Sequence, residues 1–449
     1  MQSVSLPSNF DYFNDPDDTG YPTTIRPNSD DHDKFQIETE VSAPDVILTG
    51  GIGKNVFDGI DGLLESEFSN STIKFDPVQA LAVLSNSNAG AEELYYDSTK
   101  GRWNFCLESN QILSGCFDGM RRKIYETGLV ETGGDYDARG WVDVLSESDS
   151  DVYGGTDNLI LYHHFKSSIS QFVCESRHIG MTFIYRGTTF NNYGVSSALK
   201  ASTEFVKRVF TEQPDWKHVM TAMLLHSKMC LALFNRAGVF VSKFFDIHDQ
   251  PESFVRFVVG SVFMDYDNHG FDQSLRYSRP DDDGRMSVTF NGSQYIINTV
   301  LYIEKCIRGR GTVCCEVWSV NTGEAYVIKD THRRAHEVYG ESNTMFALQG
   351  VPYVVQIVNS ENKGYSTSNL RHLYAMKEWM RSLRVDRLLC ELHASGEERI
   401  LTRILMYPAA RQLSTFRCQK ELLTVLTDAV SGKFSTQTQR KRPTEISYL

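Results

Sequence analysis

The chain has 449 residues, 41% of them hydrophobic and 12% aromatic, and a formal net charge of −12. This length suits two or three globular domains, and the acidic balance argues against general binding to nucleic acid or to a membrane surface. The nine cysteines are scattered and form no C-x-x-C pair. This pattern argues against a disulfide framework or a zinc site and indicates an intracellular protein, cytoplasmic or nuclear.

The first third of the chain gives few structural signals. Residues 1–45 are rich in Asp, Ser, Pro and Asn, which predicts a disordered acidic tail. The N-terminus lacks the basic and apolar regions of a signal peptide. Residues 46–135 form a mixed region without an assigned fold, in which residues 75–87 and 115–129 have helical spacing.

Residues 136–300 have the pattern of an α+β module. Residues 157–165 and 179–187 are predicted strands, and residues 196–214 form a helix that a proline closes. A hairpin is predicted over 229–247, with N-R-A-G as its turn, followed by a helix over 251–264. The apolar stretch 219–234 is interrupted by polar residues and is too short to span a bilayer.

Residues 301–432 form the next unit, and residues 433–449 are a predicted disordered polar and basic tail. Gly309 and Gly311 would let backbone N–H groups approach phosphate oxygens. About eighteen residues later, a strand ends in V-I-K and alternation places Lys329 on the face opposite Ile328. Spacing alone leaves two interpretations open: a nucleotide-binding loop, or a β-hairpin that ends in lysine by chance.

Four segments in order resemble the fungal-type protein kinase family: residues 202–219, 231–260, 308–333 and 403–430. The resemblance covers about residues 196–430 and implies an α+β fold. In that fold a kinase-like small lobe, the hinge and the first large-lobe helix follow an N-terminal α/β module. The implied ligand is ATP. Its binding residues would be Gly309, Gly311 and Thr312 over the phosphates, Lys329 on the α and β phosphates, and Met406, Tyr407 and Ala409 at the hinge.

The resemblance also implies a glutamate that pairs with Lys329 from the following helix. Glu341 fits best and Glu337 is second, although either could be an exposed helix charge. The third glycine position of the loop holds Cys314, which departs from the G-x-G-x-x-G pattern.

A kinase further needs an H-R-D aspartate and a D-F-G aspartate to position the hydroxyl and hold Mg²⁺. Neither triplet occurs in the sequence. We therefore expect a partial kinase domain, truncated before the catalytic loop and inactive as it stands. No catalytic or metal-binding residue is assigned, and Mg²⁺ would bind only if a complete large lobe exists. The alternative is a non-catalytic, pseudokinase-like scaffold, in which a protein partner covers the exposed hinge helix.

Three further patterns have less specific interpretations. The segment T-F-I-Y-R-G resembles a nuclease strand in which Ile184 and Arg186 replace the carboxylate and lysine, which leaves Asp157 alone and the nuclease-like core degenerate. Asp246 and His248 are expected to close a hairpin. His332 and His336 share a helical spacing, and solvated helix residues are preferred to zinc ligands.

Overall fold

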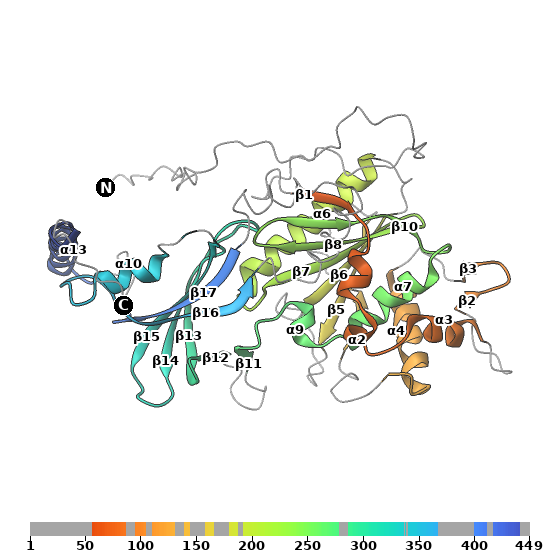
Figure 1. The fold of residues 1–449 in the computed structure, drawn as a ribbon, viewed down its shortest axis with the longest axis horizontal. Helices are drawn as coiled ribbons and strands as arrows, with labels where there is room; N and C mark the ends of the chain where they lie inside the picture. The colour runs from red at the N-terminus through yellow and green to blue at the C-terminus, as the bar shows by residue number, and fades with distance from the viewer. Residues whose placement is uncertain are drawn as a thin grey trace, which may run out of the picture.

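The computed structural model describes two β-sheets with their covering helices, seen side by side in Figure 1. The described residues are 56–86, 95–104, 110–130, 139–143, 158–165, 179–186, 192–277, 286–335, 337, 340–366, 399–410 and 416–440. Within them, no helix has both the length and the apolar character needed to cross a membrane.

The first sheet belongs to what we call the N-terminal module, the described residues from 56 to 271. Its strands run in the order β1-β9-β8-β7-β6-β5-β4, and β10 pairs with β8. Pairing is parallel between β1 and β9 and between β6 and β7, and antiparallel elsewhere. The strands are β1 (Val56–Ile60), β4 (Arg139–Asp143), β5 (Asn158–Phe165), β6 (Ile179–Arg186), β7 (His218–Leu225), β8 (Lys228–Asn235), β9 (Val239–Ser242) and β10 (Phe245–Asp246).

Helices cover both faces of this sheet, so the central strands are apolar on both sides. All residues of β7 are buried, and alternate residues along it enter two different cores. Helix α6 (Asn192–Glu212) packs on one face. The other core is built by α1 (Leu63–Glu67), α2 (Asn70–Ile73), α3 (Pro77–Ser85), α4 (Asn110–Glu126), α7 (Pro251–Val258) and α8 (Gly260–Phe263). A small hairpin, β2 (Tyr96–Asp97) and β3 (Arg102–Trp103), and helix α9 (Tyr266–His269) complete the module.

The second sheet, which we call the C-terminal sheet, is antiparallel throughout and runs in the order β11-β12-β13-β14-β15-β17-β16. Its strands are β11 (Leu275–Tyr277), β12 (Met286–Phe290), β13 (Ser293–Ile303), β14 (Val313–Ser319), β15 (Ala325–Arg334), β16 (Gln356–Ser366) and β17 (Arg399–Tyr407). Helix α10 (Glu341–Ala347) follows β15, and α13 (Gln419–Arg440) lies at the far end of the molecule (Figure 1).

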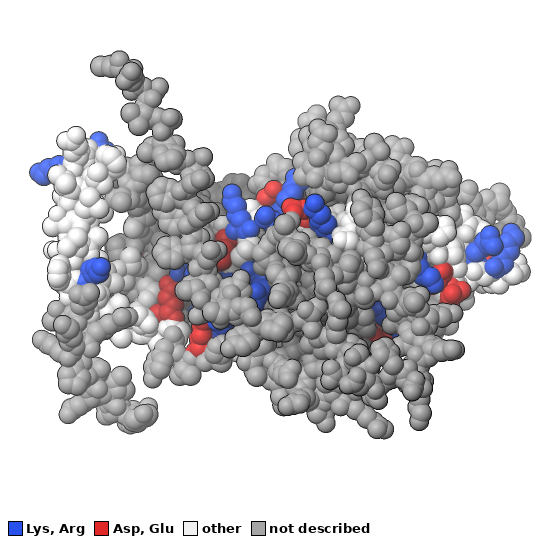
Figure 2. Space-filling model, turned by 90° about the horizontal axis from the view of Figure 1, so that it is seen from above, with Lys and Arg blue, Asp and Glu red and all other residues white. Residues whose placement is uncertain are grey.

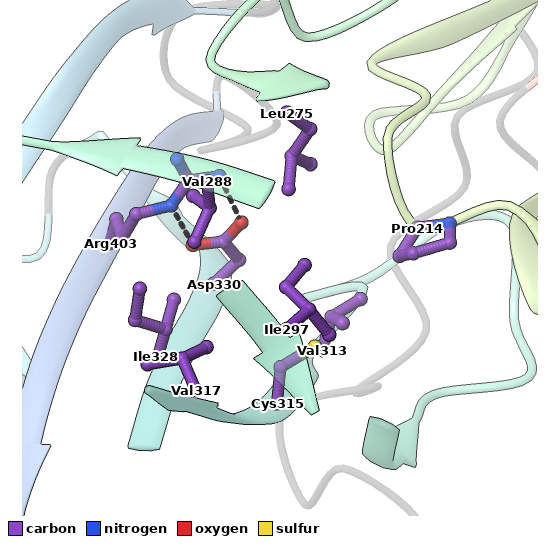
Figure 3. A pocket seen from close by; sticks show the side chains of 10 residues that line it. All are labelled: Pro214, Leu275, Val288, Ile297, Val313, Cys315, Val317, Ile328, Asp330 and Arg403. Carbon is purple, nitrogen blue, oxygen red and sulfur yellow. Dashed lines mark hydrogen bonds and ion pairs between the residues drawn. The ribbon is translucent and has the colours of Figure 1, made fainter. Parts of the chain in front are cut away.

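A buried charge network joins the C-terminal sheet to the segment that follows the N-terminal module. Arg403 on β17 is fully buried and donates to both carboxylate oxygens of Asp330 on β15, each at 2.6 Å. It also donates to Asp272 at 3.0 Å and to Ser274 Oγ at 2.7 Å. Figure 3 shows this pair beside the apolar residues that line a pocket at the junction, with Pro214 of the N-terminal module opposite.

Several predicted elements are confirmed with shifted ends. The strands at 157–165 and 179–187 are β5 and β6, the helix at 196–214 is α6, and the hairpin at 229–247 is β8 and β9. The helical spacings at 75–87 and 115–129 correspond to α3 and α4. The helix predicted over 251–264 is divided into α7 and α8, where Gly260 packs against Ile73 so closely that a Cβ would lie 2.6 Å from its Cγ2.

The units differ from the predicted boundaries at 136, 300 and 433. Strand β1 pairs with β9, so residues from 56 onward pack in the module that was predicted to begin at 136. Strands β11 to β13 belong to the C-terminal sheet, which therefore begins near residue 275. Helix α13 continues to Arg440, so the predicted disordered tail starts as helix. The predicted acidic tail 1–45 lies outside the described residues.

Candidate functional site

The lysine of the V-I-K stretch lies on the face of the C-terminal sheet that is opposite its core. Ile328 is 4% exposed and packs in the apolar cluster with Cys315 and Leu405. Because neighbouring residues of a strand point to opposite faces, Lys329 emerges on the other side. Its strand neighbours there are Cys314 on β14 and Ile404 on β17.

Lys329 forms an ion pair with the first residue of helix α10. Its Nζ donates to both carboxylate oxygens of Glu341, at 2.6 and 2.7 Å. This charge-assisted contact is short enough to hold the ammonium group in one place. Glu337, the second candidate, is exposed, and its backbone carbonyl accepts a hydrogen bond from Arg333. The structure therefore brings Lys329 together with Glu341, as the sequence interpretation expected.

The three predicted hinge residues do not share one face of the sheet. Met406 is half-buried and lies opposite Val327 in the strand pairing, which places it on the Lys329 face. Tyr407 is 45% exposed, and its ring packs against Tyr326 with centroids 5.5 Å apart, on the other face. Ala409 is half-buried beyond the end of β17. Of the three predicted hinge residues, Met406 is thus the one whose side chain shares a face with Lys329.

The loop between β13 and β14, which we call the glycine loop (residues 304–312), is closed on itself by Glu304. The Glu304 backbone N–H donates to the Thr312 carbonyl at 2.9 Å, and the Thr312 N–H donates to the Glu304 carboxylate at 2.8 Å. The Gly309 N–H donates to the carbonyl of Arg236 at 3.1 Å. Two of the N–H groups that were predicted to cover phosphates are therefore bonded to protein oxygens.

Arg236, on the β8–β9 turn, holds this loop against the N-terminal module. Its Nη1 donates to the carbonyls of Cys306 and Ile307, at 2.6 and 3.3 Å. A Cβ on Gly311 would overlap Arg236 Nε, so the guanidinium occupies the space that a side chain would need. Sequence reasoning placed N-R-A-G in a hairpin turn and gave its arginine no role.

The nuclease-like interpretation of the N-terminal module gains no support. Ile184 is fully buried in the sheet. Among the residues that the structure describes, no group of three His, Cys, Asp or Glu side chains could hold a metal ion. Asp157 and the side chain of Arg186 lie outside the described residues.

The histidine interpretations have different outcomes. The Asp246 carboxylate accepts the backbone N–H of His248 at 2.9 Å and the Ser227 hydroxyl at 2.6 Å, so Asp246 closes the turn as expected. The preferred interpretation of His332 as a solvated helix residue is wrong, because His332 lies in strand β15 and is 5% exposed. Burial, followed by the charge of Arg236, lowers its pKa to about 3. His336 lies outside the described residues.

Comparison with known protein families gives a match to this chain. A family model described as fungal protein kinase matches residues 188–441, which is more than half of the chain. No curated protein and no solved structure matches. The matched range includes α6, the β8–β9 turn, the glycine loop and the Lys329–Glu341 pair.

Proposed function

Because the chain belongs to the fungal protein kinase family, we propose that Lys329 and Glu341 form its nucleotide phosphate site. The observation that supports this most strongly is the ion pair, in which both Glu341 oxygens hold the ammonium group of a strand lysine. An ammonium fixed in this way is a positive charge for the α and β phosphates of ATP. The family activity is ATP-dependent phosphoryl transfer to Ser or Thr hydroxyls.

The structure of the site fits the nucleotide in part. Lys329 has only 20% of its side chain exposed, and burial raises the pKa of the neighbouring Cys314 thiol, which keeps that thiol neutral. Val327 and Met406 offer an apolar surface on the same face for a base. The glycine loop, as arranged, does not fit a role in phosphate binding, because the N–H groups of Gly309 and Thr312 already donate hydrogen bonds to protein oxygens.

We propose that the polypeptide as given binds ATP without transferring its γ-phosphate. Phosphoryl transfer depends on carboxylates that hold Mg²⁺ and position the attacking hydroxyl. The sequence contains neither the H-R-D nor the D-F-G triplet that would supply them. Bound ATP would supply the phosphates that Lys329 contacts, and Mg²⁺ would need ligands from a complete large lobe.

The experiment that tests this function is a thermal unfolding series with ATP. We expect ATP to raise the melting temperature of the wild-type protein and to have no effect on Lys329→Ala. Lys363→Ala is the matched control, because Lys363 pairs with Glu361 on strand β16 of the same sheet. Equal stabilisation of the wild type and Lys329→Ala would refute the assignment of the site.

A second function, protein binding through α13, is favoured by the exposure of its apolar residues. Leu423, Val430 and Phe434 are 63%, 56% and 67% exposed. Figure 2 shows mostly uncharged surface at the end of the molecule where α13 lies. A partner that covered this surface would remove the apolar area from water. We propose that α13 binds a protein partner, and substitution of Leu423 and Val430 by lysine tests this.

A further inference from the structure

The glycine loop is anchored in the core of the N-terminal module through Ile307. This side chain is fully buried and packs in the same apolar cluster as Phe210, Phe234 and Val239. A loop that closed over a nucleotide would instead carry its tip across the Lys329 face of the C-terminal sheet. The anchor therefore draws the loop toward a different module.

Arg236 adds polar contacts to this apolar anchor. It is 3% exposed and its guanidinium lies over the Phe210 ring, 4.1 Å from the centroid. It donates to two loop carbonyls, and its own carbonyl accepts the Gly309 N–H. The contacts thus run in both directions between one hairpin turn and one loop, and they fix the loop backbone at three points.

The loop lies toward the side of the sheet that is opposite Lys329. Gly311 lines a small cavity together with Arg236 and Asp330. Asp330 follows Lys329 in strand β15, so its side chain points to the other face, where it meets Arg403. The positive charge for phosphate and the backbone donors for phosphate are therefore on different sides of β15.

We propose that the N-terminal module latches the glycine loop in a closed arrangement that excludes it from the nucleotide site, and that Arg236 is the positioning residue of this latch. Nucleotide binding at Lys329 and latching compete for the backbone N–H of Gly309, which the latch holds on the Arg236 carbonyl. Release of Arg236 and Ile307 would free the loop to close over phosphates. The latch itself stands on the observed contacts, and its effect on nucleotide rests on the function proposed above.

Limited trypsin digestion measures the latch directly, because Arg308 and Arg310 flank Gly309 in the loop. We expect Arg236→Ala and Ile307→Ala each to speed cleavage after Arg308 and Arg310 by about tenfold or more. The first variant loses buried hydrogen bonds to the loop, and the second loses the buried side chain that anchors it. Arg256→Ala is the matched control. Arg256 also lies in the N-terminal module and donates to a backbone carbonyl, that of Phe68 at 2.7 Å, away from the loop. Melting curves establish that each variant is folded at the digestion temperature.

ATP titration of the same variants measures the consequence. We expect Arg236→Ala and Ile307→Ala to bind ATP several-fold more tightly than the wild type, and Arg256→Ala to bind equally. Cleavage that is unchanged in both loop variants, or equally fast in Arg256→Ala, would refute the latch whether or not ATP binds. Faster cleavage with weaker ATP binding would show that the contact supports the nucleotide site and would overturn the proposal. If no protein, wild type included, binds ATP, the proposed function fails and control of nucleotide access fails with it.

Discussion

Replacement of Arg403 by methionine tests the charge network that joins the two parts of the chain. Arg403 is fully buried, and its partners Asp330 and Asp272 have side chains that are only 14% exposed. The variant would leave two carboxylates in a largely dry site without the guanidinium that binds them. Removal of one member of a buried ion pair costs about 3–5 kcal/mol. We expect Arg403→Met to lower the free energy of unfolding by that amount at neutral pH.

The loss of unfolding free energy in Arg403→Met should depend on pH in a defined direction. Burial raises the pKa of Asp272, but the Arg403 charge and the Ser274 hydrogen bonds outweigh it, so the pKa is lowered overall. A group with a lowered pKa stabilises the folded state above its unfolded pKa, and this contribution disappears as pH falls through the folded value. In Arg403→Met, Asp272 loses the charge that lowers its pKa. The difference in unfolding free energy between variant and wild type should therefore be largest at neutral pH and shrink in acid, where Asp272 binds a proton.

Urea unfolding, followed by tryptophan fluorescence, measures this difference. Asp272→Asn and Asp330→Asn combined with Arg403→Met should recover most of the lost stability, because the neutral amides need no counter-charge. A loss below about 1 kcal/mol for Arg403→Met alone would refute the argument, since that is the range of solvent-exposed ion pairs. A deficit that grew in acid would also contradict it.

Three other outcomes follow from the structure. Burial, reinforced by the charge of Asp272, raises the pKa of Asp215 to about 7, so the folded protein holds a proton that the unfolded chain releases near pH 3.8. The free energy of unfolding of the wild type should therefore fall as the pH rises from 4 to 7. Melting curves of Asp215→Asn should lack this fall. Replacement of Leu423 and Val430 by lysine should change the melting temperature little but weaken association through α13 in sedimentation experiments. The control Thr424→Lys, on the same helix, should leave both the melting temperature and association unchanged. Association that is unaffected by the double substitution would contradict partner binding through α13. Glu341→Gln should weaken ATP binding through loss of the charge that holds Lys329, and an ATP affinity equal to that of wild type in calorimetry would show that the pair is not needed.

The sequence predicted the elements whose signals are local. Alternation placed Lys329 on the face opposite Ile328, and the pairing of β14 with β15 agrees with this. The family resemblance favoured Glu341 over Glu337 as the partner of Lys329, and the structure places Glu341 in contact with Lys329 at the first residue of α10. These features depend on residues close together in the chain.

The features that sequence reasoning missed depend on contacts between distant segments. Strand β1 was not predicted, because only its pairing with β9, about 180 residues later, makes it a strand of the sheet. His332 was taken for a helix residue because the H-R-R-A-H spacing suits a helix, but pairing of β15 with β17 extends the strand through it. Arg236 acts on a loop 70 residues away, and no local pattern indicates such a contact.

The central claim is that Lys329 lies where the phosphates of a nucleotide bind, and chemical labelling tests it most directly. An acyl phosphate of ATP transfers its acyl group to a lysine beside the phosphates, and peptide mass spectrometry then identifies the modified residue. We predict that Lys329 is acylated, that excess ATP prevents this, and that Arg236→Ala is labelled faster than the wild type. Labelling spread over other lysines, without protection of Lys329 by ATP, would contradict the account.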